Sequence, residues 1–286
     1  MAPNIKNHDG TTIVFGCGKG GVGKTTSCVC MGHLLGKRGN KVLIVDTDHQ
    51  GNASKEYGYF EDSMTQKGLF DYLYLFCLNP RRDDRPNIQD YIKKTVFKNI
   101  DIITGDPRLQ NDELEAAITS LETKRKLDPI NILITQLKSL NLYDYILIDT
   151  HPDMGIIVTS AFQASDWVLV PTTVSDNALD GAINTVYFVE DLQDAGCNVK
   201  LAGVFFSMVN MRTELARVNI AAAKRDRFKE GDVLETIIQA SEDIKKAENS
   251  MRPASEAYPT CRAVKNYEKL LTEVVNKIGK ETSSIS

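Results

Sequence analysis

Two lysines and a run of glycines near the start of the chain form a phosphate-binding motif. Read from Gly18, the pattern G-x-x-x-x-G-K-T is complete, and Lys19 stands five residues ahead of the motif's own lysine, Lys24. Backbone N–H groups of such a loop can surround an anion, and glycines are needed because side chains would block that approach. We expect Lys24 to reach the β and γ phosphates of a nucleotide and the Thr25 hydroxyl to coordinate Mg²⁺. The residues predicted to bind the nucleotide in this loop are Gly18, Lys19, Gly20, Gly21, Val22, Gly23, Lys24, Thr25 and Thr26.

Acidic residues follow two apolar segments that are typical of buried strands. Residues 41–45 lead into Asp46 and Asp48, and residues 145–148 lead into Asp149. Carboxylates at the C-terminal ends of strands, beside a phosphate loop, can hold Mg²⁺ and its waters or orient an attacking water. Taken alone, two aspartates after a strand would more readily be a helix cap or a turn.

The flanking segments are those that a phosphate loop requires. Residues 11–15 before it are apolar and β-branched, which indicates a buried strand, and residues 26–36 after it read as a helix. Strand, loop and helix together direct a helix N-terminus at one anion. Further apolar strand candidates are residues 100–103, 167–171, 201–206 and 233–238. Their alternation with helical stretches predicts an α/β fold, a mostly parallel twisted sheet with helices on both faces, formed by residues 1–286 as a single domain.

The motifs also resemble those of one family. The pattern K-G-G-x-G-K-[ST]-[ST], which begins at Lys19, resembles the deviant Walker A signature of the ParA/MinD superfamily of P-loop NTPases. The segments that contain Asp48 and Asp149 resemble two further elements of ParA-type partition ATPases, D-x-D-P-Q-G-N-[AS] and D-Y-I-[IL]-I-D-T-P-P. His49 and His151 each stand where the family pattern has a proline, and we assign neither histidine a catalytic role.

The resemblance implies ATP and Mg²⁺ as cofactors and an ATP-sandwich dimer. The implied catalytic residues are Lys19, which reaches the partner's phosphates, Lys24, and Asp48, which positions the hydrolytic water. The resemblance also places the turn at 207–212 on the adenine side, with Asn210 as a nucleotide-binding residue. The residues implied for the metal are Thr25, Asp46 and Asp149.

Basic residues in the C-terminal third are candidates for binding DNA. The net charge is −4, so affinity for phosphates requires a local cluster rather than a basic total. Chromosomal ParA relatives carry arginines for this purpose at two places; one corresponds to Arg212 and the other falls on Asp243, an acid. Solvated helix faces are the competing interpretation of these cations. The candidate DNA-binding residues are Arg212, Arg225, Arg227, Lys245, Lys246, Arg252, Arg262 and Lys265.

These observations favour a partition ATPase that binds double-stranded DNA without sequence preference and is stimulated by a ParB-like adaptor. The alternative is a MinD-like membrane or cargo-positioning ATPase. The last predicted helix, residues 262–278, has one apolar face but a polar face that is not uniformly basic, which favours packing in the core over membrane binding. A reductase related to the nitrogenase iron protein would need bridging cysteines, and neither Cys77 nor Cys197 lies in the expected context.

Composition sets further limits. No apolar run approaches a membrane span, and six cysteines without a C-x-x-C pair indicate reduced thiols, so we expect a cytoplasmic protein without a membrane partner. The resemblance to ParA proteins implies that it associates with the nucleoid. The segment before the phosphate loop is too short for the helix-turn-helix domain of some plasmid ParA proteins. We expect residues 1–10 and 280–286 to be flexible. The stretch 69–99, with its charged loop 81–86, reads as an insertion of unknown role.

Overall fold

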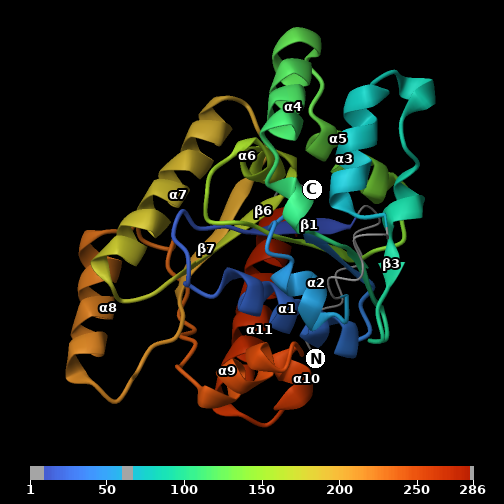
Figure 1. Cartoon of the computed structure of the whole chain (residues 1–286). Helices are drawn as coiled ribbons and strands as arrows, with labels where there is room; N and C mark the ends of the chain where they lie inside the picture. Colours follow the sequence, from blue (N-terminus) through green and yellow to red (C-terminus); the bar gives the residue numbers. More distant parts are fainter. Residues whose placement is uncertain (1–9, 60–66, 284–286) are drawn as a thin grey trace.

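The computed structural model describes residues 10–59 and 67–283, and its centre is one seven-stranded sheet (Figure 1). The strand order is β3-β4-β2-β5-β1-β6-β7, and all neighbours are parallel except β3 and β4. The strands are β1 Thr11–Phe15, β2 Val42–Asp46, β3 Lys93–Lys94, β4 Ile100–Ile103, β5 Tyr145–Asp149, β6 Trp167–Thr172 and β7 Lys200–Phe206. The predicted fold class is confirmed.

Helices cover both faces of this sheet (Figure 1). One face packs against α1, α11 and the short α10, and the other against α3 to α7, while α8 packs beside α7 at the β7 edge. The helices on the first face are α1 Lys24–Lys37, α2 Asn52–Glu56, α9 Glu242–Asn249, α10 Ala254–Ala257 and α11 Arg262–Ser283. The others are α3 Leu69–Leu78, α4 Asp112–Arg125, α5 Pro129–Ser139, α6 Ile156–Ala164, α7 Asp176–Asp194 and α8 Glu214–Asp226.

The central strands are apolar throughout because both of their faces are covered. Every residue of β1, β2, β4, β5 and β6 is buried. Side chains alternate between the two layers: Val14 packs with the α3–α7 layer, whereas Ile13 and Phe15 pack with α1 and α11. Each such side chain contributes about 1.5–3 kcal/mol when it is fully buried. This packing fixes the carboxyl ends of β1, β2 and β5 side by side.

One predicted strand is wrong. Residues 233–238 lie beside β7 but form no regular strand: Val233 makes an isolated bridge to Val204, and the N–H of Ile238 donates to the carbonyl oxygen of Phe206 at 2.8 Å. The backbone N–H groups of Glu235 and Thr236 donate instead to the carboxylate of Glu273 on α11, at 2.7 and 3.0 Å. Because a side chain satisfies these donors, a regular ladder does not continue along the segment.

The last helix begins where it was predicted and ends later, at Ser283. Its apolar face, which includes Val264, Tyr267 and Val274, is fully buried against the sheet, so the predicted packing in the core is confirmed. The predicted flexible tail therefore overlaps α11 at residues 280–283. The predicted flexible residues 1–9 and 284–286 lie outside the described ranges. No helix within those ranges is both long and apolar enough to cross a membrane.

The stretch 69–99 has structure of its own. It forms α3, which packs on α4 and α5, and then β3, which adds an antiparallel edge to the sheet through β4. Within the predicted charged loop, Arg82–Asp84 forms a single 3₁₀ turn. Both residues of β3 are lysines, and charged side chains on an edge strand oppose pairing with another sheet.

Candidate nucleotide-binding site

The phosphate loop connects β1 to α1 and has the backbone that its glycines permit. Gly21 and Gly23 have φ angles of 72° and 89°, a region that L side chains rarely adopt, and Gly23 caps α1. Gly16 at the end of β1 lies against Phe162 of α6, where an added Cβ would be 2.0 Å from the ring. The loop is thus held closely on the sheet, with the N-terminus of α1 facing the cavity beside it.

Hydroxyl groups that follow β7 and β5 brace the loop and the end of β1. The Oγ of Ser207, after β7, donates to the carbonyl oxygen of Val22 at 2.5 Å. The Oγ1 of Thr150, after β5, donates to the carbonyl oxygen of Phe15 at 2.7 Å. These buried hydrogen bonds leave the loop's exposed N–H groups free to face a ligand.

A cavity of about 550 Å³ opens in front of the loop. Its walls are the loop itself, the segments that follow β2 and β5, and the stretch around α9. The loop residues that line it are Gly20, Gly21, Gly23, Lys24, Thr25 and Thr26. This volume lies within the usual range for small-molecule sites.

Lys24 is buried at the base of this cavity. Its ammonium donates to the carbonyl oxygens of Cys17 at 3.2 Å and Lys19 at 3.0 Å. Burial lowers the pKa of Lys24, and the acidic side chains of Asp149 and Asp48 oppose that shift. A cation held in place beside the loop can bind a phosphate, and this role of Lys24 stays a prediction.

Lys19 has the opposite environment. It is exposed, does not line the cavity, and makes no side-chain hydrogen bond or ion pair with any residue in the described ranges. Its Cβ packs near Gly181 of α7, where an added Cβ would approach it to 3.0 Å. The Lys19 ammonium is therefore not part of its own subunit's pocket.

Asp46 braces the loop that carries Asp48. One of its carboxylate oxygens accepts from the backbone N–H and the hydroxyl of Ser54, at 2.8 and 2.6 Å, and the other accepts from the Asp48 N–H at 3.1 Å. Burial raises the pKa of Asp46 to about 6, and the hydrogen bonds from Ser54 oppose that shift. Its role as a metal-site residue stays a prediction.

Asp149 is the residue that best fits a cation. It is fully buried, and neither carboxylate oxygen has a hydrogen-bond partner of acceptable geometry within the described part of the chain. Burial raises the pKa of Asp149 well above its usual range, and the Asp46 carboxylate adds to this, while the neighbouring Thr25 hydroxyl opposes it. Unpaired buried carboxylate oxygens are costly, and oxygen ligands are those that Mg²⁺ prefers. The donor set at the end of β5 therefore fits the predicted magnesium ion.

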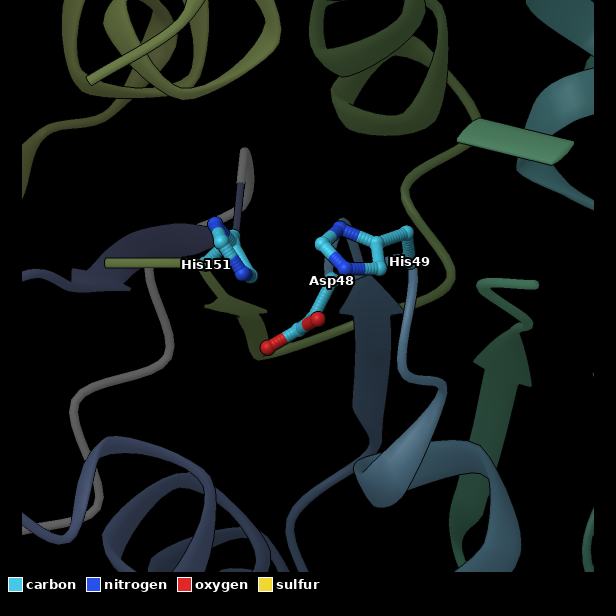
Figure 2. Close-up of side chains that lie close together, drawn as sticks. All are labelled: Asp48, His49 and His151. Carbon is cyan, nitrogen blue, oxygen red and sulfur yellow. The ribbon is translucent and has the colours of Figure 1, made fainter. Parts of the chain in front are cut away.

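Asp48 lies at the wall of the cavity, almost completely buried. One of its oxygens accepts from the backbone N–H of Gln50 at 2.8 Å. His49 and His151 lie next to it, with their ring centroids 4.3 Å apart (Figure 2). The sequence did not reveal this group, because the two histidines are about a hundred residues apart and meet only through the pairing of β2 with β5.

The sequence also did not reveal a hydrogen bond between α1 and α9 at the edge of the cavity. The Thr26 hydroxyl donates to a Glu248 carboxylate oxygen at 2.5 Å, and both residues line the cavity. Glu56 of α2 lines it as well, and burial raises the pKa of Glu56 well above its usual range, with Glu248 adding to the shift. In the sequence these acids are indistinguishable from solvated helix residues.

The predicted adenine-side turn is near the cavity, but a different residue lines it. Asn210 is exposed, and its side chain accepts from the backbone N–H of Arg212 at 3.2 Å. Met208, whose φ of 53° lies in the left-handed region, is the residue of this turn that lines the cavity. Asn210 as a nucleotide ligand stays a prediction.

The candidate DNA-binding cations fall into two groups, one on and beside α8 and the other on α9 to α11 (Figure 1). Five of them form ion pairs within the chain: Arg225 with Asp226, Arg227 with Asp180, Lys245 with Glu242, Lys246 with Asp243, and Arg252 with Glu256. The other three make no ion pair or side-chain hydrogen bond with any residue that the structure describes: Arg212, Arg262 and Lys265. A single free basic cluster is therefore not evident.

The fold and site together define a class of protein. A mostly parallel sheet, a glycine loop between β1 and α1, a buried loop lysine and acids at the ends of β2 and β5 are the parts of a P-loop NTPase, here with an additional lysine at position 19.

Comparison with known proteins agrees with this class. The AAA_31 family, an AAA domain, matches residues 10–202. The chain is 32% identical to the chromosome-partitioning ATPase Soj of Treponema pallidum, over 94% of this chain and 99% of the relative. It is 30% identical to the sporulation initiation inhibitor protein Soj of Bacillus subtilis, over 90% and 94% of the two chains. The chain therefore belongs to the AAA_31 family and, within it, to the Soj/ParA group.

A solved structure shows the same fold. The complex of Cyanothece McdA with ATP superposes with a TM-score of 0.75 and 24% identity, over 95% of this chain and 97% of that one.

Proposed function

We propose that the chain is a Mg²⁺-dependent ATPase that partitions a plasmid or chromosome through an ATP-sandwich dimer. The observation that carries the proposal is that the two loop lysines have opposite environments. Lys24 is buried at its own phosphate loop, whereas Lys19 is exposed and outside its own cavity. Family membership among Soj/ParA relatives supports the same conclusion.

The dimer follows from where Lys19 can act. The Lys19 ammonium has no partner in the described part of the chain, so it is available to the phosphates of a facing subunit, where it would add a second cation to the triphosphate. Two subunits related by a two-fold axis would exchange these lysines symmetrically. Formation of the closed dimer would then depend on ATP, because without the phosphates the Lys19 ammonium of one subunit would be repelled by the positive charge at the other subunit's loop.

Hydrolysis in this arrangement depends on positioning and neutralisation of charge. Mg²⁺ would be held by the Thr25 hydroxyl and through the acids at the strand ends, where it neutralises charge on the phosphates. This chain's own residues supply the remainder: Asp48, at the cavity wall, orients water, while Lys24 and the partner's Lys19 stabilise the transferring phosphoryl group. A cation supplied from outside the subunit can change turnover by about 10³–10⁵-fold.

DNA affinity would rise on dimerisation, because two weak basic surfaces then act together. Arg212, Arg262 and Lys265 are the candidates without a side-chain partner among the described residues, and the ion-paired cations could exchange their carboxylates for DNA phosphates. A ParB-like adaptor would stimulate hydrolysis and release the dimer. The MinD-like alternative receives no support from α11, whose apolar face lies in the core.

The test is dimerisation measured by analytical ultracentrifugation with Mg²⁺ and a non-hydrolysable ATP analogue, with and without duplex DNA. We expect a monomer without nucleotide, a dimer with it, and DNA binding only by the dimer. Lys19→Ala is the matched variant: it should bind nucleotide as a monomer but fail to dimerise. A Lys19→Ala chain that dimerises like the wild type would refute the sandwich arrangement.

A further inference from the structure

Three side chains with metal-ligating atoms meet at the edge of the cavity. One ligand atom each from Asp48, His49 and His151 lies within 4.8 Å of the other two (Figure 2). Nothing in the proposed ATPase cycle uses the two imidazoles. Asp48 is buried and both histidines are half-buried, so these side chains are sheltered from solvent.

The fold holds this group together. β2 and β5 are neighbours in the sheet, and Asp46 pairs with Asp149 at their carboxyl ends. His49 follows β2 by three residues and His151 follows β5 by two, so the two loops leave the sheet side by side. The same pairing places Asp48 next to both rings. Their proximity is thus fixed by the central strands rather than by chance contact of long surface side chains.

Asp153 surrounds one ring nitrogen of His151. The Nδ1 of His151 accepts from the backbone N–H of Asp153 at 3.2 Å and lies 3.3 Å from the carboxylate oxygen of the same residue. A metal at Nε2 would move the ring proton from Nε2 to Nδ1, where the Asp153 carboxylate can accept it, which is the arrangement common around metal-binding histidines. One Asp48 oxygen accepts from Gln50, and the other makes no hydrogen bond to the described residues.

We propose that Asp48, His49 and His151 bind a transition-metal ion such as Zn²⁺, at a site separate from that of Mg²⁺. Two imidazoles and one carboxylate suit zinc, cobalt or nickel, whereas Mg²⁺ prefers oxygen ligands and water. Ligand atoms about 2.0–2.2 Å from an ion are at most about 4.4 Å apart, so small side-chain rotations complete the site. Water would fill the fourth position.

Metal binding would inhibit the ATPase. An ion on the Asp48 carboxylate withdraws that group from the water that it orients, and places positive charge where the attacking water must lie. This consequence depends on the role proposed for Asp48; binding of the ion does not. The site would make hydrolysis sensitive to the supply of free transition metal.

Titration of the nucleotide-free full chain with Co²⁺, followed by visible absorption, tests the site directly. We expect one ion per chain with the intense d–d bands of a four-coordinate complex, displaced by Zn²⁺ but not by a thousandfold excess of Mg²⁺. His49→Gln and His151→Gln should each weaken binding by at least the roughly 10–100-fold that loss of an outer-shell partner costs. His33→Asn, at a histidine of α1 that hydrogen-bonds Ser255 and is not part of this group, is the matched control and should bind like the wild type.

Thermal unfolding without metal checks that each variant is folded, and Asp48→Asn removes the third ligand independently. Wild-type Co²⁺ affinity in His49→Gln and His151→Gln would show that the rings merely pack together and would overturn the proposal, as would displacement of Co²⁺ by Mg²⁺. With Mg²⁺ present throughout, Zn²⁺ should also lower ATP turnover at least tenfold in the wild type, relative to the same protein with a chelator selective for Zn²⁺ over Mg²⁺, and less in the His49→Gln/His151→Gln double variant. Metal binding without inhibition would overturn the proposed role of Asp48 and leave the site intact.

Discussion

The ammonium of Lys24 donates a hydrogen bond to the backbone carbonyl oxygen of Lys19 at 3.0 Å. The two lysines of the motif are therefore in contact, although their ammonium groups lie in different environments. Lys24 is held at the base of its own cavity, and the side chain of Lys19 is exposed outside it. A phosphate that enters the loop competes with the Lys19 carbonyl for the Lys24 ammonium. The backbone that carries Lys19 is therefore one that nucleotide binding can adjust.

Lys24→Ala should abolish nucleotide binding and hydrolysis. The substitution removes the only buried ammonium beside the loop within the described residues, and with it a charge-assisted hydrogen bond to phosphate that nothing else replaces. Isothermal titration with ATP and Mg²⁺ measures binding, and phosphate release measures turnover. Wild-type turnover in Lys24→Ala would show that the nucleotide lies elsewhere.

Asp48→Ala should leave ATP binding intact and trap a long-lived dimer. The side chain lies at the cavity wall and not among the loop residues that hold phosphate, so its loss removes the orientation of water and little binding energy. We expect turnover to fall by at least about a hundredfold, as when other positioned proton-transfer groups are lost. Size-exclusion chromatography with ATP detects the dimer, and a variant that stays monomeric contradicts either the role of Asp48 or the sandwich.

The fold and the phosphate site could be predicted because their signals are local. The strand at 11–15, the glycines and Lys24 are adjacent in sequence, and the acids at 46 and 149 directly follow apolar runs. The strand at 233–238 failed because apolar periodicity does not show that Glu273, nearly 40 residues further on, takes its N–H groups. No periodicity rule anticipates such a side-chain partner.

The sequence also could not predict which residues meet across the sheet. The two histidines became a group only once β2 and β5 were known to be neighbours. Among the ion-paired cations proposed for DNA, only Arg227 has a distant partner, Asp180 of α7. The others pair with acids one to four residues away, which their spacing in the sequence could have indicated. Charge counts reveal the cations and not the acids that fold against them.

Folding stability should fall between pH 6.5 and about 4 because of His33. This buried side chain of α1 hydrogen-bonds Ser255 at 2.8 Å and packs edge-on against Phe97, and burial lowers the pKa of His33 to about 4, with Lys37 adding to the shift. The folded pKa lies below the unfolded one, so in this window the unfolded chain binds the proton and the folded chain does not. The stabilisation is complete above pH 6.5 and is lost as the pH falls.

Urea unfolding at pH 7.5, 6 and 5 measures this loss, which we expect to be roughly 1–2 kcal/mol once the solvent that reaches the ring is allowed for. His33→Asn, whose amide can keep the bond to Ser255, should show a flatter dependence. Other groups titrate in the same window, so the difference between the two proteins isolates His33. Parallel curves for wild type and variant would mean that the pKa of His33 is the same in the folded and unfolded states, and would contradict the prediction.

Asp149→Asn should give a protein that is at least as stable as the wild type without ligands but that no longer gains stability from Mg²⁺. The wild-type carboxylate is fully buried with both oxygens unpaired among the described residues, and removing a buried unpaired charge relieves a desolvation cost. Active sites commonly carry such instability for the sake of function. With ligand at about a hundred times its dissociation constant, MgATP should add about 2.7 kcal/mol to the wild type, and each kcal/mol is about 2–4 °C in a chain of this size.

Differential scanning calorimetry with ATP, in Mg²⁺ and in EDTA, separates these two effects. Asp101→Asn is the control: Asp101 is also nearly buried, but its carboxylate accepts from Lys94 at 2.7 Å and Tyr143 at 2.8 Å. Loss of this paired carboxylate should lower the midpoint temperature of unfolding and leave the Mg²⁺-dependent gain in stability unchanged. That is the reverse of the result expected for Asp149→Asn. If Asp149→Asn instead loses stability and keeps its response to Mg²⁺, Asp149 is a structural acid and the cation lies nearer to Asp48.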